Sequence, residues 1–115
     1  MTTTALLQSI LTGIDPAVEV HRDFHRGSGE DYIVHEILTE RDTAYADDMP
    51  QAQTDTVRVH YFTKGSSTSV KKAIRQRLRE AGFTILYTEP LREPDTGYHH
   101  IVIEARRTAA LEDDE

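Results

Sequence analysis

The sequence predicts a single small α+β domain, with a mixed and largely antiparallel sheet and two helices packed on one face. The chain has 115 residues, which is the usual size of one domain. Two segments place apolar residues at helical spacing, and several shorter segments alternate apolar and polar residues as strands do. We expect the domain to occupy residues 1–107, and the acidic residues 108–115 to form a flexible tail.

The two helices are predicted from their apolar stripes and their ends. The segment TTTALLQSILTG offers a threonine as N-cap and Gly13 as a left-handed stop. The stronger helix covers residues 69–81 and ends at Gly82, where Leu78 and Phe83 have the spacing of the hydrophobic contact in a Schellman ending. Its apolar stripe consists of Val70, Ala73, Ile74, Leu78 and Ala81.

The strands are predicted from alternation. AVEVHRDF is typical of a short edge strand, whereas DYIVHEILTE is apolar on both faces and indicates a central strand. In TVRVHYFT, Val57, Val59 and Tyr61 are expected to face inward, with Arg58 and His60 facing outward. FTILYTE and YHHIVIEARR are the remaining strands, joined by a polar connection, EPLREPDTG.

The segment from residue 41 to residue 55 has no sustained period and contains Pro50. We therefore predict a long extended arm loop there. A loop of about 15 residues in a compact domain is more often a functional arm than a simple connection.

Composition excludes several kinds of chemistry. The chain has no cysteine, so disulfides, thiolate nucleophiles and thiolate metal sites are excluded. The first residues lack the basic region of a signal peptide, and no apolar run approaches the roughly 20 residues of a membrane span. The net charge of −7 argues against general affinity for nucleic acids, although residues 64–79 hold six basic residues and no acidic one.

The triplet Asp95-Thr96-Gly97 is the one with which aspartic proteases present a catalytic carboxylate. A shared proton between two aspartates requires a buried loop that directly follows an apolar strand. Here the triplet follows LREP and precedes Tyr98, so proline, aspartate and glycine favour a turn between two strands. We predict that the chain is not an enzyme.

Six histidines raise the question of a metal site. His99 and His100 are adjacent in a strand and point to opposite faces, so they cannot chelate together. His60 can face one of them across the strands, which supplies two ligands, one fewer than a usual catalytic site. We expect no metal and no cofactor.

The basic helix leaves three interpretations open. Its cations can form a solvated face, contact the acidic arm of a neighbouring copy, or bind nucleic acid. The acidic residues of that arm are Glu40, Asp42, Asp47, Asp48 and Asp55. A small nucleic-acid-binding α+β protein that uses helix 69–81 is therefore the alternative to an assembly protein.

The ordered set of these features resembles the tail completion family of long-tailed bacteriophages, over residues 5–107. After the first helix come a strand that ends near a Tyr-Ala-Asp arm, a strand with Val-x-Val-x-Tyr, and a Ser/Thr-capped basic helix that closes with Ala-Gly-Phe. Asp-Thr-Gly-Tyr then opens the last strand. The acidic tail EDDE has no place in the family pattern.

The resemblance implies a structural protein of the virion, assembled in the host cytoplasm, with no catalytic motif. Members form rings, commonly hexamers, at the head-proximal end of the tail, between the tail tube protein and the head or neck connector protein. DNA would pass only through the ring, no membrane is involved, and terminator and connector roles both remain open. The residues predicted to contact neighbouring subunits are Tyr45, Asp47, Asp48, Met49, Lys71, Lys72, Arg75 and Arg79.

Overall fold

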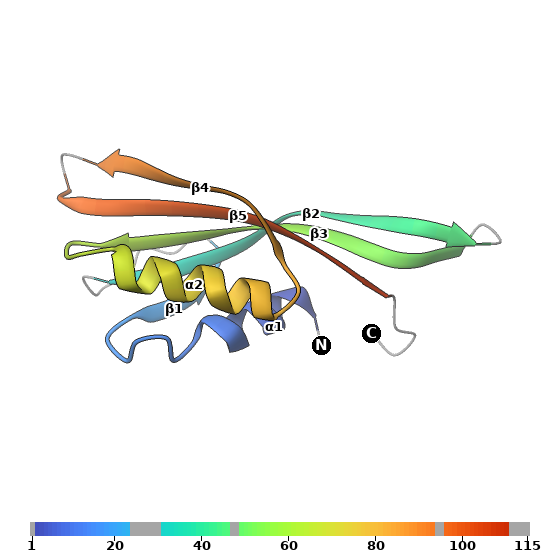
Figure 1. Cartoon of the computed structure of the whole chain (residues 1–115), viewed down its shortest axis with the longest axis horizontal. Coiled ribbons are helices and arrows are strands. Elements are labelled where there is room, and N and C mark those ends of the chain that lie inside the picture. Colours follow the sequence, from blue (N-terminus) through green and yellow to red (C-terminus); the bar gives the residue numbers. More distant parts are fainter. Residues whose placement is uncertain (1, 24–30, 47–48, 94–95, 111–115) are drawn as a thin grey trace.

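The computed structural model describes residues 2–23, 31–46, 49–93 and 96–110, without the side chains of residues 44, 45, 92 and 93. Two helices and five strands follow one another along this part of the chain (Figure 1). They are α1 (Thr3–Leu11), β1 (Glu19–Arg22), β2 (Tyr32–Ala46), β3 (Met49–Thr63), α2 (Thr68–Glu80), β4 (Thr84–Glu93) and β5 (Tyr98–Ala110). The predicted α+β class is confirmed.

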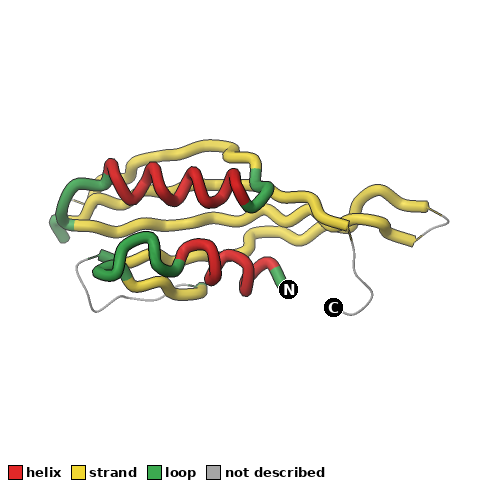
Figure 2. The backbone as a smooth tube through the Cα atoms, turned by 60° about the horizontal axis from the view of Figure 1, so that its bottom comes forward, coloured by secondary structure: helices red, strands yellow, loops and turns green. Residues whose placement is uncertain are grey.

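The strands form one mixed sheet in the order β1-β2-β3-β5-β4. Only β1 and β2 run parallel, and the other neighbours are antiparallel. Both helices lie on the same face of the sheet, near one end of a molecule that measures 53 × 23 × 23 Å (Figures 1 and 2). The long axis follows β2 and β3, which extend well past the helices.

The main core lies between the helices and this face of the sheet. Val57, Val59 and Tyr61 of β3 point into it, as their alternation predicts. They meet Leu7 of α1 and Ile74 of α2, both of which are fully buried. Because side chains alternate along a strand, the intervening residues of β3 must lie on the opposite face.

The helix ends form as local sequence predicts. The Thr2 hydroxyl accepts a hydrogen bond from the Ala5 amide at 3.1 Å, which caps α1. At the end of α2 the Phe83 amide donates to the Leu78 carbonyl at 2.9 Å, and the Gly82 amide donates to the Arg79 carbonyl at 3.0 Å. With Gly82 at φ +94°, these two bonds are those of a Schellman ending.

The prediction of a loop at residues 41–55 is wrong, because the described backbone there forms two paired strands. Residues 41–46 continue β2, residues 49–55 belong to β3, and the two strands pair as far as Ala46 opposite Met49. No helix covers this part of the sheet (Figure 1), so its side chains need no apolar alternation and the strand signal disappears from the sequence. Hydrogen bonding between backbones, which is independent of side-chain type, still holds the hairpin together.

Two further boundaries differ from the prediction. Residues 89–93, expected to be part of a polar connection, extend β4 to Glu93. Residues 108–110, expected in the tail, extend β5, where Ala110 pairs with Ala52 and the hydroxyls of Thr54 and Thr108 lie 2.7 Å apart. The base of the arm is therefore three-stranded. The rest of the tail, residues 111–115, lies outside the described residues.

Candidate interaction surfaces

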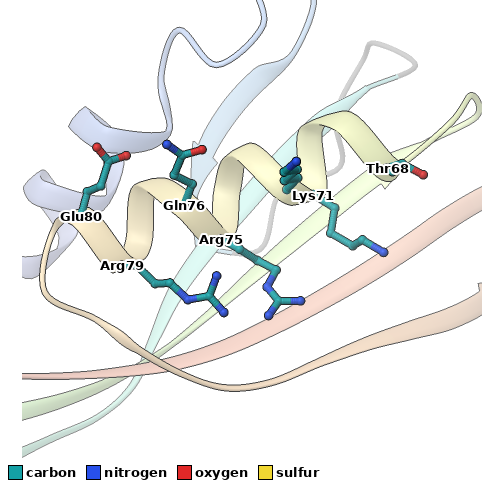
Figure 3. A pocket seen from close by; sticks show the side chains of 7 residues that line it. Thr68, Lys71, Arg75, Gln76, Arg79 and Glu80 are labelled. Atoms are coloured by element: carbon teal, nitrogen blue, oxygen red, sulfur yellow. The ribbon is translucent and has the colours of Figure 1, made fainter.

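The first candidate surface is a groove of about 470 Å³ on the outer side of α2. Figure 3 shows Lys71, Arg75 and Arg79 projecting from the same side of the helix. The groove is lined by Thr68, Lys71, Lys72, Arg75, Gln76, Arg79 and Glu80. It therefore contains all four basic residues that the sequence predicts as contacts, and we call it the basic groove.

Helical periodicity places these cations together. Val70, Ile74 and Leu78 are buried against the sheet, so the residues one position further along, Lys71, Arg75 and Arg79, form a parallel row beside that stripe. Within the described residues, no carboxylate lies within ion-pair distance of the four cations. The positive charge of the groove is therefore available to a partner.

Arg77 is a cation of α2 with a different role. Its Nη1 donates to the Ile10 carbonyl at 3.1 Å, on α1. This bond satisfies one of the carbonyls at the end of α1 that have no partner within the helix. Arg77 thus joins the two helices and is not part of the basic groove.

The second candidate surface is the arm, which we define as residues 40–46 of β2 and 49–55 of β3. Glu40 and Asp42 are exposed, and Met49 is exposed to 63%. Tyr45 pairs with Pro50 through the backbone. Asp47 and Asp48, the other predicted contacts, lie outside the described residues.

Asp55 does not belong with the acidic residues that reach outward. Its side chain is buried, and it accepts hydrogen bonds from the Thr3 hydroxyl and from Gln53 Nε2, the latter at 2.6 Å. Thr3 is the first residue of α1, where a negative charge is stabilised by the helix dipole. The expectation that Asp55 meets a neighbouring copy is therefore corrected, because an internal contact occupies it.

The two surfaces lie at opposite ends of the molecule (Figures 1 and 2). Asp55 lies beside the start of α1. The six residues from Asp55 to Met49 extend the arm about 20 Å beyond that point. The arm tip cannot fold back onto α2, because its strands are paired throughout. The structure thus excludes a contact between the arm and the basic groove of the same chain. A contact between these two surfaces therefore requires two chains.

A third feature lies on the sheet face opposite the helices. His60 Nδ1 and His100 Nε2 are 2.9 Å apart, and His60 Nε2 is 2.9 Å from the Glu36 carboxylate. The His100 ring stacks on Phe62 at 4.1 Å, and Phe62 stacks on Tyr32 at 4.6 Å. The predicted approach of His60 to His100 is confirmed, but His60 is buried and not exposed as its outward position suggested.

Burial lowers the pKa of His60, and the neighbouring Glu36 carboxylate partly opposes this effect. The three side chains form a row in which His60 uses both ring nitrogens, so they do not converge on one point. In the part of the chain that the structure describes, no three metal-ligating side chains converge on a cation site. The sequence analysis missed this aromatic packing, whose signal was Tyr32 beside the inward Ile33 and Phe62 beside the inward Tyr61.

The Asp-Thr-Gly segment connects β4 to β5. Glu93 pairs with Tyr98, and Gly97 between them has φ +75°, a conformation that glycine adopts without strain. Thr96 and Gly97 are exposed. This geometry supports the predicted turn, while Asp95 lies outside the described residues.

Comparison with known proteins yields one kind of match. No protein-family model and no curated protein sequence matches the chain. Among solved structures, a chain from the virion of a native gene transfer agent particle has a similar fold, with a TM-score of 0.54 and 13% sequence identity. The match covers 95% of this chain and 87% of the other. At this identity the similarity establishes a shared fold across nearly the whole domain. None of the described helices has the length and apolar character needed to cross a membrane.

Proposed function

We propose that this chain is a structural protein of a tailed bacteriophage or a phage-like particle, which forms a ring at the head-proximal end of the tail and joins tail to head. The single observation that carries the proposal is the fold shared with a chain of a gene transfer agent virion. The resemblance of the ordered sequence features to tail completion proteins supports the same assignment.

The distribution of surfaces supports ring formation. A head-to-tail ring needs two different patches on each copy, one complementary to the other, whereas a twofold dimer needs one self-complementary patch. This chain has a basic groove on α2 and an arm that carries Glu40, Asp42 and the exposed Met49. Because the two lie at opposite ends, each copy can use both at once.

In this proposal the product is an assembly and not a reaction, so no cofactor takes part. The partners are further copies of the chain, together with the tail tube protein and the head or neck connector protein. The family resemblance implies that six copies close the ring. The protein acts in the neck region of the virion after assembly in the host cytoplasm. DNA crosses the open centre of the ring.

The test is to shorten the arm without disturbing the domain. Thr43 lies opposite Ala52 in register, so replacing residues 44–51 by Asn-Gly closes the hairpin with a favoured two-residue turn. We expect the shortened chain to keep its circular dichroism spectrum and to sediment as a monomer at concentrations where the intact chain forms a ring. The matched control is Gln51→Ala, which changes the arm surface but not its length. If the shortened chain assembles as the intact one does, the arm tip formed by residues 44–51 is not needed for the contact.

One observation favours a second candidate function, the binding of nucleic acid. The four cations of the basic groove have no carboxylate within ion-pair distance among the described residues, and phosphate contacts require such cations. The net charge of −7 opposes it. Salt-dependent binding of mixed-sequence DNA or RNA that is lost in Arg75→Glu with Arg79→Glu would support this function. No binding at low salt would exclude it.

A further inference from the structure

The sheet has a long unpaired edge on each side. β1 pairs only with residues 32–35 of β2. Beyond that point the outer edge of β2, residues 36–46, has no neighbouring strand among the described residues. On the other side β4 is the last strand, and its outer edge is unpaired from Thr84 to Glu93. Unpaired edges of this length present backbone groups that readily pair with another chain.

Exposed apolar side chains gather on one of these edges. Leu86, Tyr87 and Leu91 are exposed to 40%, 38% and 40%, and all three belong to β4. The remaining large apolar side chain that is exposed, within the described ranges, is Met49 on the arm. β4 also contains Glu89, Pro90 and a bulge between Ile85 and Tyr87, which are features that limit edge pairing, so it is the exposed apolar side chains that favour a covered edge.

The acidic residues of the arm lie on the same side of the sheet as the helices. Glu40 is directly opposite Asp55, and Asp42 is opposite Gln53, so each pair shares a face. Asp55 bonds to Thr3 of α1, which identifies that face as the helical one. Glu40 and Asp42 therefore point to the side on which α2 lies.

The basic groove lies on that same side, next to the other edge. α2 packs against β4 and β5 (Figure 2). If the sheet of one copy continued into the next with the helices on the same side, Glu40 and Asp42 of one copy would approach the cations of its neighbour. The charges and the positions of the unpaired edges therefore favour the same arrangement of neighbouring copies.

We propose that residues 36–46 of β2 in one copy pair with β4 of the next copy, so that one β-sheet continues around the assembly. This inference rests on the proposed function and specifies its subunit contact. Main-chain hydrogen bonds between strands supply affinity, as in peptide recognition by strand addition. The attraction between Glu40 and Asp42 of one copy and the basic groove of the next determines how the faces of the two sheets align. The added strand also covers Leu86 and Leu91.

The contact is heterologous, because the two edges belong to different strands. A contact of this kind closes into a ring or continues as a filament. Pro90 on β4 lacks an amide donor, and proline is normally confined to edge strands for that reason, so we expect the ladder between the two copies to be interrupted at this residue.

Cross-linking tests the pairing directly, because the natural chain has no cysteine. One preparation carries Asp42→Cys and the other Leu86→Cys, and the mixture is treated with a short bismaleimide. We expect the mixed dimer to exceed both like-with-like products. The matched control replaces Asp42→Cys with Ser9→Cys, an exposed residue of α1 that lies outside both edge strands, and should give no excess of mixed product.

A charge exchange provides the second measurement. Glu40→Lys with Asp42→Lys, and separately Arg75→Glu with Arg79→Glu, should each shift sedimentation toward the monomer. All four changes in one chain should restore assembly, which a role confined to folding or to nucleic acid would not produce. An oligomer that forms without the mixed cross-link overturns the strand pairing but leaves ring formation intact. A chain that stays monomeric at every concentration contradicts both.

Discussion

Two buried histidines make the stability of this protein depend on pH in a predictable direction. His35 is exposed to 1%, and its Nε2 lies 2.7 Å from Gln8 Oε1 on α1. Burial lowers its pKa from 6.5, with Asp23 opposing and Arg22 adding to the effect. Burial likewise lowers the pKa of His60 on the opposite face of the sheet, although Glu36 opposes it.

The sign follows from proton uptake. At about one pH unit or more above 6.5, both histidines are neutral in the folded and in the unfolded chain, so the stability that they contribute is fully present. As the pH falls below 6.5, the unfolded chain binds protons while the buried sites resist, and the free energy of unfolding decreases. Each histidine lowers it by about 1.4 kcal/mol per pH unit, until the pH reaches the lowered pKa of the folded state. Together they give a slope of about 2.7 kcal/mol per unit, a large part of a typical total of about 5–15 kcal/mol.

Urea unfolding followed by circular dichroism between pH 7.5 and 5.5 measures this slope. We expect little change near pH 7.5 and a decline that steepens as the pH falls through 6.5. The decline should become much shallower in a double variant that carries both His35→Leu and His60→Phe. The control is His99→Gln, which changes an exposed histidine of β5 and should retain the full slope. Equal slopes in the natural chain and in the double variant would refute the reasoning.

Three further predictions concern stability and can be measured by chemical unfolding at pH 7.5. Asp55→Ala should cost about 1–3 kcal/mol, because Thr3 and Gln53 lose their acceptor and α1 loses a negative charge at its start; a neutral effect would show that the carboxylate is not needed there. Gly82→Ala should cost about 1–2 kcal/mol from the left-handed backbone alone, since an added Cβ would meet Arg107 Nε at an ordinary 3.6 Å. Ile74→Ala should cost about 2–5 kcal/mol, because the side chain is fully buried beneath α2, whereas the exposed Gln76→Ala should change stability little.

The helices could be predicted closely because their signals are local. A threonine hydroxyl within reach of an amide caps α1, and a glycine with positive φ ends α2, whatever the rest of the chain does. The apolar stripe of α2 likewise identified its buried side, and so it identified the row of cations that form the basic groove. These parts of the candidate site were therefore predictable from spacing alone.

The arm was predictable in its position but not in its structure. Alternation reports which side chains are buried, and the arm has no helix over it (Figure 1). Its pairing depends on backbone hydrogen bonds, which leave no pattern in residue type. For the same reason Asp55 could not be distinguished from Asp42 in the sequence, although one is held by α1 and the other is exposed.

The sequence by itself determined the fold class, the two helices with their ends, and the inward faces of the strands, because short-range periodicity and capping encode them. Tertiary structure alone decided which of His99 and His100 lies beside His60, and that the arm is a paired hairpin. It also decided that β4 ends the sheet on one side, and that β2 has no neighbouring strand beyond β1 on the other side among the described residues. Strand order and register bring together residues that are far apart in the chain, and no local sequence pattern determines which strands become neighbours.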